Sequence, residues 1–285
     1  MKTVLYARVS TADQTLDHQK TQAEAAGFTI DEVVAAIKEQ RPQMVFAPHV
    51  ETASGIMLPD DYIKAVGEAV EEVGGLFVLD CIASGAMWVD MKACHVDVLI
   101  SAPQKGWSAS PCSGLVMLNQ RALDKLEQTT SNSFACDLKR WWQIMQAYEN
   151  GGHAYHATMP TDALKRFRDI MLETVENGLG DLKTNQTELG RKARQLFADY
   201  GYQSVAAPGF EAPGVAVFYA PSDTMKSGKP FLEQGLQIAA GVPLQCNEPE
   251  TFKTFRIGLF GLEKLRNVER TLEHLKQALD NLPKD

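Results

Sequence analysis

Residues 78–107 decide the fold, and they read VLDCIASGAMWVDMKACHVDVLISAPQKGW. An apolar run over residues 76–79 ends at Asp80, and a second run over residues 96–102 ends in a turn that carries Lys105. Short apolar runs bounded by turn residues are typical of buried strands in a parallel sheet. The carboxyl ends of such strands meet at one edge, where ligands bind in open α/β folds. We therefore expect one carboxylate and one amine to lie together at that edge.

This acid and this amine suit an aromatic aldehyde cofactor. Lys105 would form a Schiff base with pyridoxal 5'-phosphate (PLP), and Asp80 would hold a proton on the pyridine nitrogen, which makes the ring an electron sink. Taken singly, an aspartate at a strand end is more often a turn former, and a lysine after a strand is more often a solvated charge. Their joint placement after neighbouring apolar strands favours a shared site.

The composition is that of a globular protein with room for a large α/β domain and a smaller one. The chain has 285 residues, 45% of them hydrophobic, and a net charge of −8, which disfavours nucleic acid or an anionic membrane as a partner. Its five cysteines are scattered without a CxxC pair, which indicates a reducing compartment and argues against a zinc site. Without a signal-peptide pattern or a spanning apolar run, we expect a soluble cytoplasmic protein.

The first 28 residues, MKTVLYARVSTADQTLDHQKTQAEAAGF, resemble the opening of a serine recombinase of the resolvase/invertase family. The resemblance places a nucleophile at Ser10 and a phosphate-contacting arginine at Arg8. The further arginines and the helix-turn-helix of that family have no counterpart later in the chain, although recombination needs several cations around the scissile phosphate. A serine recombinase is therefore the least favoured function.

Hydrophobic periodicity predicts alternating strands and helices from residue 31 onwards. The expected helices cover residues 31–39, 60–73, 120–128, 137–150, 161–177 and 182–199, with helical stretches within 222–237 and 262–282. The expected strands cover residues 43–47, 76–79, 96–102, 113–119, 202–206, 214–220 and 254–259. We expect three parts: a recombinase-like fragment (1–34), a PLP-binding large domain (35–160), and linking helices with a small α+β domain (161–285).

Five segments carry a second and longer resemblance. They are HVETASGI (49–56), LFVLDCIASGAMWVD (76–90), VDVLISAPQKGW (96–107), YHATMP (155–160) and FRIGLFG (255–261). In this order they resemble a class V aminotransferase of the alanine–glyoxylate or serine–pyruvate type, from about residue 31 to the C-terminus. The resemblance implies fold type I of the PLP-dependent enzymes, an α/β fold with a mainly parallel sheet flanked by helices and a smaller α+β C-terminal lobe.

The resemblance also implies roles at the cofactor. Lys105 matches the Schiff-base lysine, and Asp80 matches the partner of the pyridinium nitrogen. Gln104 matches a residue that hydrogen-bonds the cofactor phosphate. Ile82 falls where a side chain packs on one ring face, and Thr52 falls where the family places a cofactor-facing hydroxyl.

Other matching positions concern the substrate and the subunit interface. Arg256 matches an arginine that grips the substrate carboxylate. Tyr155 and Thr158 match residues that reach the phosphate of the neighbouring subunit, so the resemblance implies a homodimer. The implied substrates are a small amino acid such as alanine or serine and a 2-oxo acid such as glyoxylate or pyruvate. His153 and His156 lie in a loop without a third ligand nearby, so we expect no metal site.

The resemblance also has departures. The family carries a further N-terminal segment with a small-residue loop that cradles the cofactor phosphate, and we expect that segment to be missing here. Val50 replaces the usual glycine of the HVET-like motif, and Thr52 replaces a more common serine. Two other hypotheses therefore stay open beside a transaminase: a folded non-catalytic remnant of an aminotransferase fused to a mobile-element fragment, and the recombinase.

Overall fold

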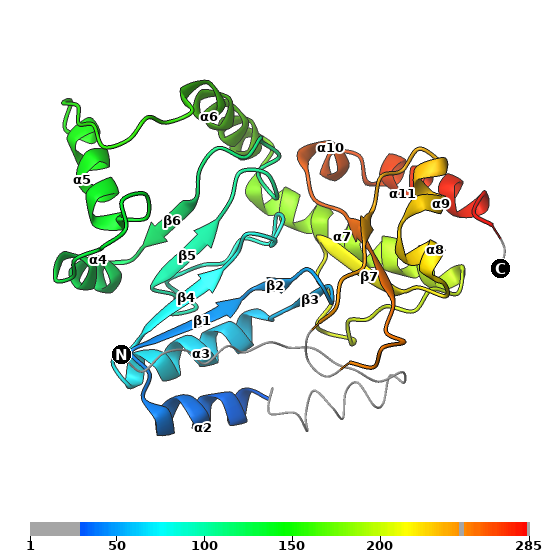
Figure 1. Cartoon of the computed structure of the whole chain (residues 1–285), viewed down its shortest axis with the longest axis horizontal. Helices are drawn as coiled ribbons and strands as arrows, with labels where there is room; N and C mark the ends of the chain where they lie inside the picture. Colours follow the sequence, from blue (N-terminus) through cyan, green and yellow to red (C-terminus); the bar gives the residue numbers. More distant parts are fainter. Residues whose placement is uncertain (1–28, 245–247, 284–285) are drawn as a thin grey trace.

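The computed structural model describes residues 29–244 and 248–283 (Figure 1). The stretch that resembles a recombinase, with Arg8 and Ser10, lies outside the described residues. The chain forms a larger lobe and a smaller lobe that meet along one long helix (Figure 1). None of the helices within the described ranges is long and apolar enough to span a bilayer.

The larger lobe is built on a four-stranded sheet with the order β1-β4-β5-β6. Its elements are α2 (Ile30–Gln40), β1 (Met44–Pro48), β2 (Val50–Glu51), β3 (Ile56–Met57), α3 (Asp60–Glu72), β4 (Leu76–Asp80), β5 (Val98–Ser101), β6 (Leu115–Leu118), α4 (Gln120–Glu127) and α5 (Leu138–Glu149). Strands β1, β4 and β5 are parallel, and β6 is antiparallel to β5. The register places Pro48, Asp80 and Ile100 side by side, so the carboxyl ends of three strands share one edge.

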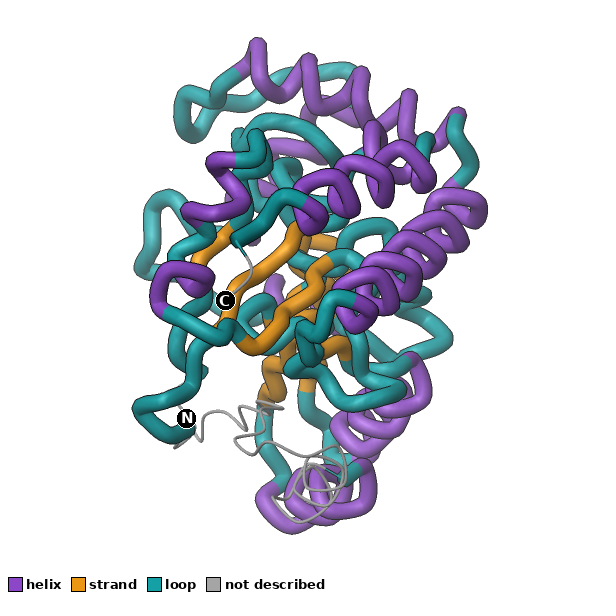
Figure 2. The backbone as a smooth tube through the Cα atoms, turned by 90° about the vertical axis from the view of Figure 1, so that its right-hand side faces the viewer, coloured by secondary structure: helices purple, strands orange, loops and turns teal. Residues whose placement is uncertain are grey.

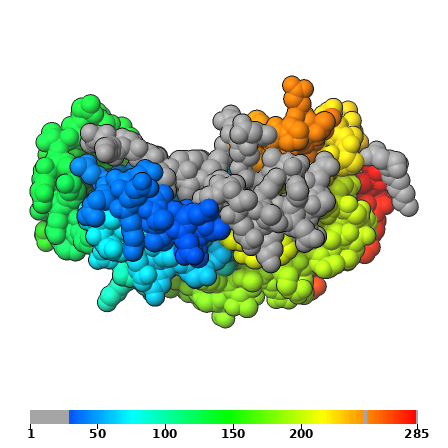
Figure 3. Space-filling model, turned by 90° about the horizontal axis from the view of Figure 1, so that it is seen from below, coloured from blue at the N-terminus to red at the C-terminus, as the bar shows by residue number. Residues whose placement is uncertain are grey.

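One face of this sheet packs against helices. The side chains of Val45, Phe77 and Leu99 point into a core that α3 covers, and α2 lies along the outer side of α3. Figure 3 shows α2 and α3 side by side on the lower surface of the larger lobe. Strand side chains alternate between faces, so the residues between them belong to the other face. That face carries exposed apolar residues, including Phe46 at 40% exposure.

Two helices, α6 (Thr161–Glu176) and α7 (Leu179–Asp199), connect the lobes. Gly178 separates them with a φ of 80°, a conformation that favours glycine, so one helical run becomes two. Leu189, Ala193 and Phe197 recur at spacings of four along α7 and are fully buried. This stripe packs into the core of the smaller lobe.

The smaller lobe has an antiparallel sheet with the order β7-β9-β8. Its elements are β7 (Val215–Tyr219), α8 (Asp223–Lys226), α9 (Lys229–Glu233), β8 (Ala239–Ala240), β9 (Thr254–Gly258), α10 (Leu262–Leu265) and α11 (Val268–Asp280). In Figure 2 the strands lie inside a shell of helices. Aromatic rings fill the core, with Phe197 of α7 stacked 4.4 Å from Phe218 of β7. The prediction of an α+β lobe with an antiparallel sheet is confirmed.

Some predicted elements differ from those in the structure. The predicted strand over residues 202–206 is wrong, since that segment makes only a single bridge, Ser204 to Phe218. The loop after β1 contains a hairpin of two short strands, β2 and β3, which was not expected. Strand β5 is shorter than the predicted run over residues 96–102, because Asp97 and Ala102 lie in the flanking turns.

Candidate active site

Asp80 ends β4 at the edge where three parallel strands stop. Its side chain is exposed, and Oδ1 accepts a hydrogen bond of 2.9 Å from the backbone N–H of Ile82. Oδ2 has no hydrogen-bond partner among the described residues. The carboxylate is therefore oriented by its own turn and keeps one oxygen available for a ligand.

Lys105 lies in the turn that follows β5. The side chain is half-buried, and Nζ lies 5.8 Å from the ring centre of Phe260, which comes just after β9. No described acidic residue forms an ion pair with this ammonium. The turn is closed by hydrogen bonds from Ser108 N to Lys105 O (3.1 Å) and from Ala109 N to Pro103 O (3.0 Å).

The turn of Asp80 and the turn of Lys105 touch through two glycines. A Cβ on Gly106 would lie 2.2 Å from the carbonyl oxygen of Gly85, so only glycine allows this approach. Gly85 itself has a φ of 64°, which also favours glycine. The acid-bearing loop and the amine-bearing loop are therefore in direct backbone contact.

The smaller lobe is fastened to the Lys105 turn. Ser108 has a φ of 61°, and its Oγ accepts a hydrogen bond of 2.8 Å from the backbone N–H of Leu262, the first residue of α10. The side chain of Gln186 in α7 donates to the carbonyl oxygens of Pro213 (3.1 Å) and Leu259 (3.2 Å). These contacts fix the position of the smaller lobe relative to the sheet edge.

The other predicted cofactor residues lie in loops at this same edge. Thr52 sits half-buried in the turn between β2 and β3, Ile82 is half-buried after Asp80, and Gln104 is exposed beside Lys105. Their contacts with a cofactor stay a prediction. They do follow β1, β4 and β5, the three strands whose carboxyl ends meet.

Arg256 lies in the middle of β9, between Val217 of β7 and Ala239 of β8. The side chain is half-buried, and Nε donates a hydrogen bond of 2.9 Å to the carbonyl oxygen of Ala240. Its two Nη groups make no ion pair within the part of the chain that the structure describes. A fixed Nε with free Nη atoms suits a carboxylate that binds through two parallel hydrogen bonds.

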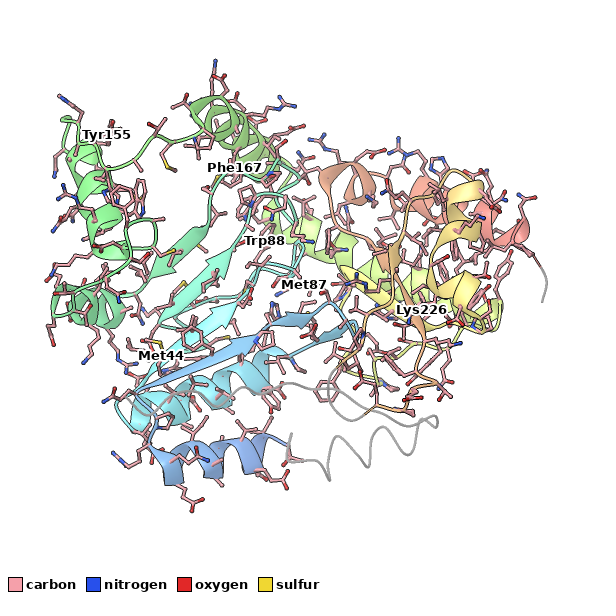
Figure 4. All side chains as sticks on the ribbon, in the orientation of Figure 1. Met44, Met87, Trp88, Tyr155, Phe167 and Lys226 are labelled. Carbon is pink, nitrogen blue, oxygen red and sulfur yellow. The ribbon has the colours of Figure 1, made fainter. Side chains whose placement is uncertain are left out.

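Tyr155 and Thr158 lie apart from this edge. They are in the loop between α5 and α6, where the Tyr155 hydroxyl is 3.1 Å from Oγ1 of Thr158 and the tyrosine is 73% exposed. Figure 4 places Tyr155 beside α5, away from Trp88 at the sheet edge. In the same loop, His156 Nε2 bonds the carbonyl oxygen of Phe134. The residues described here contain no group of three or more metal-ligating side chains.

The sequence analysis gave no role to His49, which follows β1 directly. His49 is only 2% exposed, its Nδ1 lies 2.7 Å from Ser84 Oγ, and Cys81 Sγ lies 3.8 Å from the same nitrogen. Burial lowers the pKa of His49 to about 4 and raises the pKa of the Cys81 thiol to about 12. The histidine is therefore neutral and the thiol protonated near pH 7. His49 continues the every-second-residue pattern of the buried Val45 and Ala47, and this alternation could have predicted that its side chain points inward.

The donor set at the edge fits PLP. The cofactor needs a carboxylate for its pyridine nitrogen and a primary amine for its aldehyde, and the two loops in contact carry one of each. Asp80 keeps one oxygen without a partner, and Lys105 is free of ion pairs with the described acidic residues.

Comparisons with known proteins agree with this arrangement. A family model described as Aminotransferase class-V matches residues 8–202, so the similarity begins before the expected residue 31. The alanine–glyoxylate aminotransferase of Callithrix jacchus is 27% identical over 275 residues, which cover 94% of this chain and 64% of that protein. The 2-aminoethylphosphonate–pyruvate transaminase of Burkholderia ambifaria is 26% identical over 250 residues, which cover 87% and 64% of the two chains.

Solved structures show the same fold. The alanine–glyoxylate aminotransferase from Nostoc sp. has a TM-score of 0.74 at 20% identity, over 97% of this chain and 75% of that chain. The ureidoglycine–glyoxylate aminotransferase from Bacillus subtilis has a TM-score of 0.72 at 22% identity, over 88% and 64%. The chain spans about 64% of the length of the curated relatives named above. With the family model matching well over half of its residues, this chain belongs to the class V aminotransferases and has the α/β fold of type I PLP-dependent enzymes.

Proposed function

We propose that this chain is a PLP-dependent transaminase that moves an amino group between a small amino acid, alanine or serine, and a 2-oxo acid, glyoxylate or pyruvate. The backbone contact between Gly85 and Gly106 is the observation that carries the proposal. It joins the loop of the proposed nitrogen partner, Asp80, to the loop of the proposed nucleophile, Lys105. If Asp80 and Lys105 were only solvated surface charges, their loops would not need to be in backbone contact.

When bound, PLP supplies an electron sink for the negative charge that develops at the substrate Cα. The free Oδ2 of Asp80 holds a proton on the pyridine nitrogen, and the N–H of Ile82 keeps this carboxylate oriented. Lys105 would hold the cofactor aldehyde through Nζ, and its amine, once displaced by the amino group of the substrate, would move a proton at the substrate Cα. Gln104 and Thr52 hold polar atoms of the cofactor, and Ile82 packs on the ring.

Arg256 binds the carboxylate that amino acids and 2-oxo acids share. Because Nε is held by Ala240, the planar guanidinium presents its Nη atoms from a fixed position on β9. The names of the curated relatives include glyoxylate and pyruvate, which supports a small 2-oxo acid as acceptor. The amino donors in these names differ, alanine in one and 2-aminoethylphosphonate in the other.

We also propose a homodimer in which Tyr155 and Thr158 serve the partner's site. In one protomer these hydroxyls lie 3.1 Å apart in an exposed loop, and Figure 4 places Tyr155 beside α5. An exposed tyrosine and threonine paired in a loop are placed to meet a second copy. The loop would then contribute to the phosphate end of a cofactor held mainly by the other chain.

A spectroscopic titration tests the function. Wild-type protein mixed with PLP is expected to gain a visible absorbance band that the variant Lys105→Ala does not show. Lys92→Ala, at an exposed lysine of the same segment, is the matched control and should retain the band. With L-alanine and glyoxylate, the loaded protein should form pyruvate and glycine. A colourless wild type would reject the proposal, and a band without pyruvate would favour a binding protein without this turnover.

A further inference from the structure

A cavity lies beside the N-terminus of α3, where that helix meets the loop after β4 and α7. It has a volume of about 340 Å³, and His49, Trp88 and Lys183 are among the residues that line it. Asp80 is exposed, whereas the next residue, Cys81, points into the core between the sheet and α3 and contacts His49. None of the proposed cofactor residues, Thr52, Asp80, Ile82, Gln104 and Lys105, lines this cavity.

Charges of both signs face this cavity. Asp60 and Asp61 form the first turn of α3, and Lys183 comes from α7. Lys183 Nζ is 3.9 Å from Asp60 Oδ2, longer than a hydrogen bond, and 3.4 Å from the carbonyl oxygen of Trp88. Pro59, the N-cap of α3, offers no side-chain cap, and Asp61 Oδ1 accepts a hydrogen bond of 2.9 Å from the backbone N–H of Tyr62. The lysine and the helix N-terminus can therefore receive a carboxylate, and the aspartates can receive an ammonium.

His49 adds a polar ring atom to the wall of this cavity. Its Nδ1 edge is taken up by Ser84 and Cys81, so the Nε2 edge is the one that meets the cavity. Nε2 has no hydrogen-bond partner within residues 29–244 and 248–283. Only 2% of the residue is exposed, and Nε2 is open to the cavity, where water or a ligand can bond it. Burial keeps the imidazole neutral, with a pKa of about 4, so Nε2 adds a hydrogen-bonding group and no charge.

The remaining walls are apolar. Met57 and Met87 line the cavity together with the ring of Trp88. The indole N–H of Trp88 donates to the carbonyl oxygen of Leu179 (3.0 Å), and its ring lies 5.0 Å from that of Trp107. This fixes the tryptophan as a rigid wall at the carboxyl edge of the sheet, where Figure 4 shows Met87 and Trp88. Methionine side chains adapt to varied apolar groups.

We propose that this cavity binds a free α-amino acid with an apolar side chain at a site separate from the cofactor site. The carboxylate binds Lys183 and the N-terminus of α3. The ammonium group binds between the carboxylates of Asp60 and Asp61 and the Nε2 of His49. The side chain packs against Met57, Met87 and Trp88. The site uses neither PLP nor Lys105, so it does not depend on the proposed transamination.

Calorimetric titration of the full chain, prepared without PLP, tests this site with three probes of one length. L-norleucine carries both charges, n-pentylamine lacks the carboxylate, and hexanoate lacks the ammonium. We expect norleucine to bind at least ten-fold more tightly than either of the others. Equal affinities for the three probes, or no binding of norleucine, would overturn the proposal.

Substitutions test whether norleucine binds at this cavity. Lys183→Met should weaken norleucine about ten-fold or more, since a charge-assisted hydrogen bond is lost, and should leave pentylamine unchanged. Lys165→Met, at an exposed lysine of α6, is the matched control and should have no effect. Arg256→Met should also have no effect, because that arginine belongs to the proposed transaminase site. Loss of norleucine binding in Arg256→Met, or unchanged binding in Lys183→Met, would overturn the proposal. Circular dichroism checks that the variants fold.

Discussion

His49 shows how one buried side chain makes stability depend on pH. The imidazole is held by Ser84, and burial is the largest cause of its low pKa, about 4, while the charge of Asp60 acts in the opposite direction. In the unfolded chain the same group has an ordinary pKa near 6.5. Between these values the unfolded chain binds more protons than the folded chain, so protonation favours unfolding.

The free energy of unfolding should therefore fall as the pH is lowered from 7 to 5. The contribution of His49 to this fall is about 2 kcal/mol, from the difference between the two pKa values. In His49→Asn, which keeps a short polar group beside Ser84, the dependence on pH should be flatter by about that amount. Urea titrations at the two pH values measure it. His274→Asn, at an exposed histidine of α11, is the control, and an equal flattening there would contradict the assignment to His49.

At the scale of elements, one carboxylate joins two strands and a helix. Asp97 stands just before β5 and is 1% exposed. Its Oδ2 accepts from the backbone N–H of Phe77 in β4 (2.8 Å), and its Oδ1 accepts from Asn119, the N-cap of α4 (2.8 Å), and from Arg121 Nη1 (3.0 Å). Arg121 also donates to the carbonyl oxygen of Gly75 (2.6 Å). The amino ends of β4, β5 and α4 are fixed together by this group.

Asp97→Ala should lower the free energy of unfolding by about 3 kcal/mol, because a buried N–H and a partly buried arginine lose their partner together. Chemical denaturation measures the change. Asp169→Ala removes a carboxylate from the surface pair Arg168–Asp169 and is the matched control, with an expected change below about 1 kcal/mol. An equal decrease in the free energy of unfolding in both variants would contradict a special contribution of the Asp97 hydrogen bonds to stability.

Elements with long periodic patterns were predictable from the sequence, and elements set by tertiary contacts were not. The predicted helix over residues 60–73 and the run over residues 76–79 match α3 and β4 closely, since apolar spacing reports burial directly. The strands β2, β3 and β8 have two residues each, too few for any periodicity. The partners of Asp97 lie twenty or more positions away in the sequence, so no local pattern predicts these contacts.

At the scale of the whole molecule, the sequence predicted the two central residues of the candidate site but not the contacts that surround them. Asp80 and Lys105 were singled out as strand-end residues, and their loops do meet. The contact through Gly85 and Gly106 and the approach of Phe260 to Lys105 arise only when loops from distant segments come together. The cavity lined by His49 also depends on α7, which begins about 130 residues later.

A mixing experiment tests the proposed dimer. Lys105→Ala should lack activity because its own site has no amine, and the double variant Tyr155→Phe/Thr158→Ala should lose activity at the partner's site. Mixed in equal amounts and allowed to exchange, the two should regain about one quarter of the wild-type activity, since half of the dimers pair the two variants and each such dimer has one intact site. Activity assays on the mixture and on each variant alone give the answer. If each variant is inactive alone, no recovery despite exchange would show that the hydroxyls act within their own chain, whereas full activity of the double variant alone would show that they have no role.

The N-cap of α10 is Gly261, which has no side chain, and the N–H of Leu262 instead donates to Ser108 Oγ in the turn of Lys105. Because this bond joins the two lobes, any movement of α10 must either break it or move Ser108 as well. If the smaller lobe tilts during a catalytic cycle while this bond is kept, the turn of Lys105 and its amine move with that lobe. The pivot for such a tilt would have to lie outside the 105–108 turn, and Gly178, between α6 and α7, is a backbone position suited to that role.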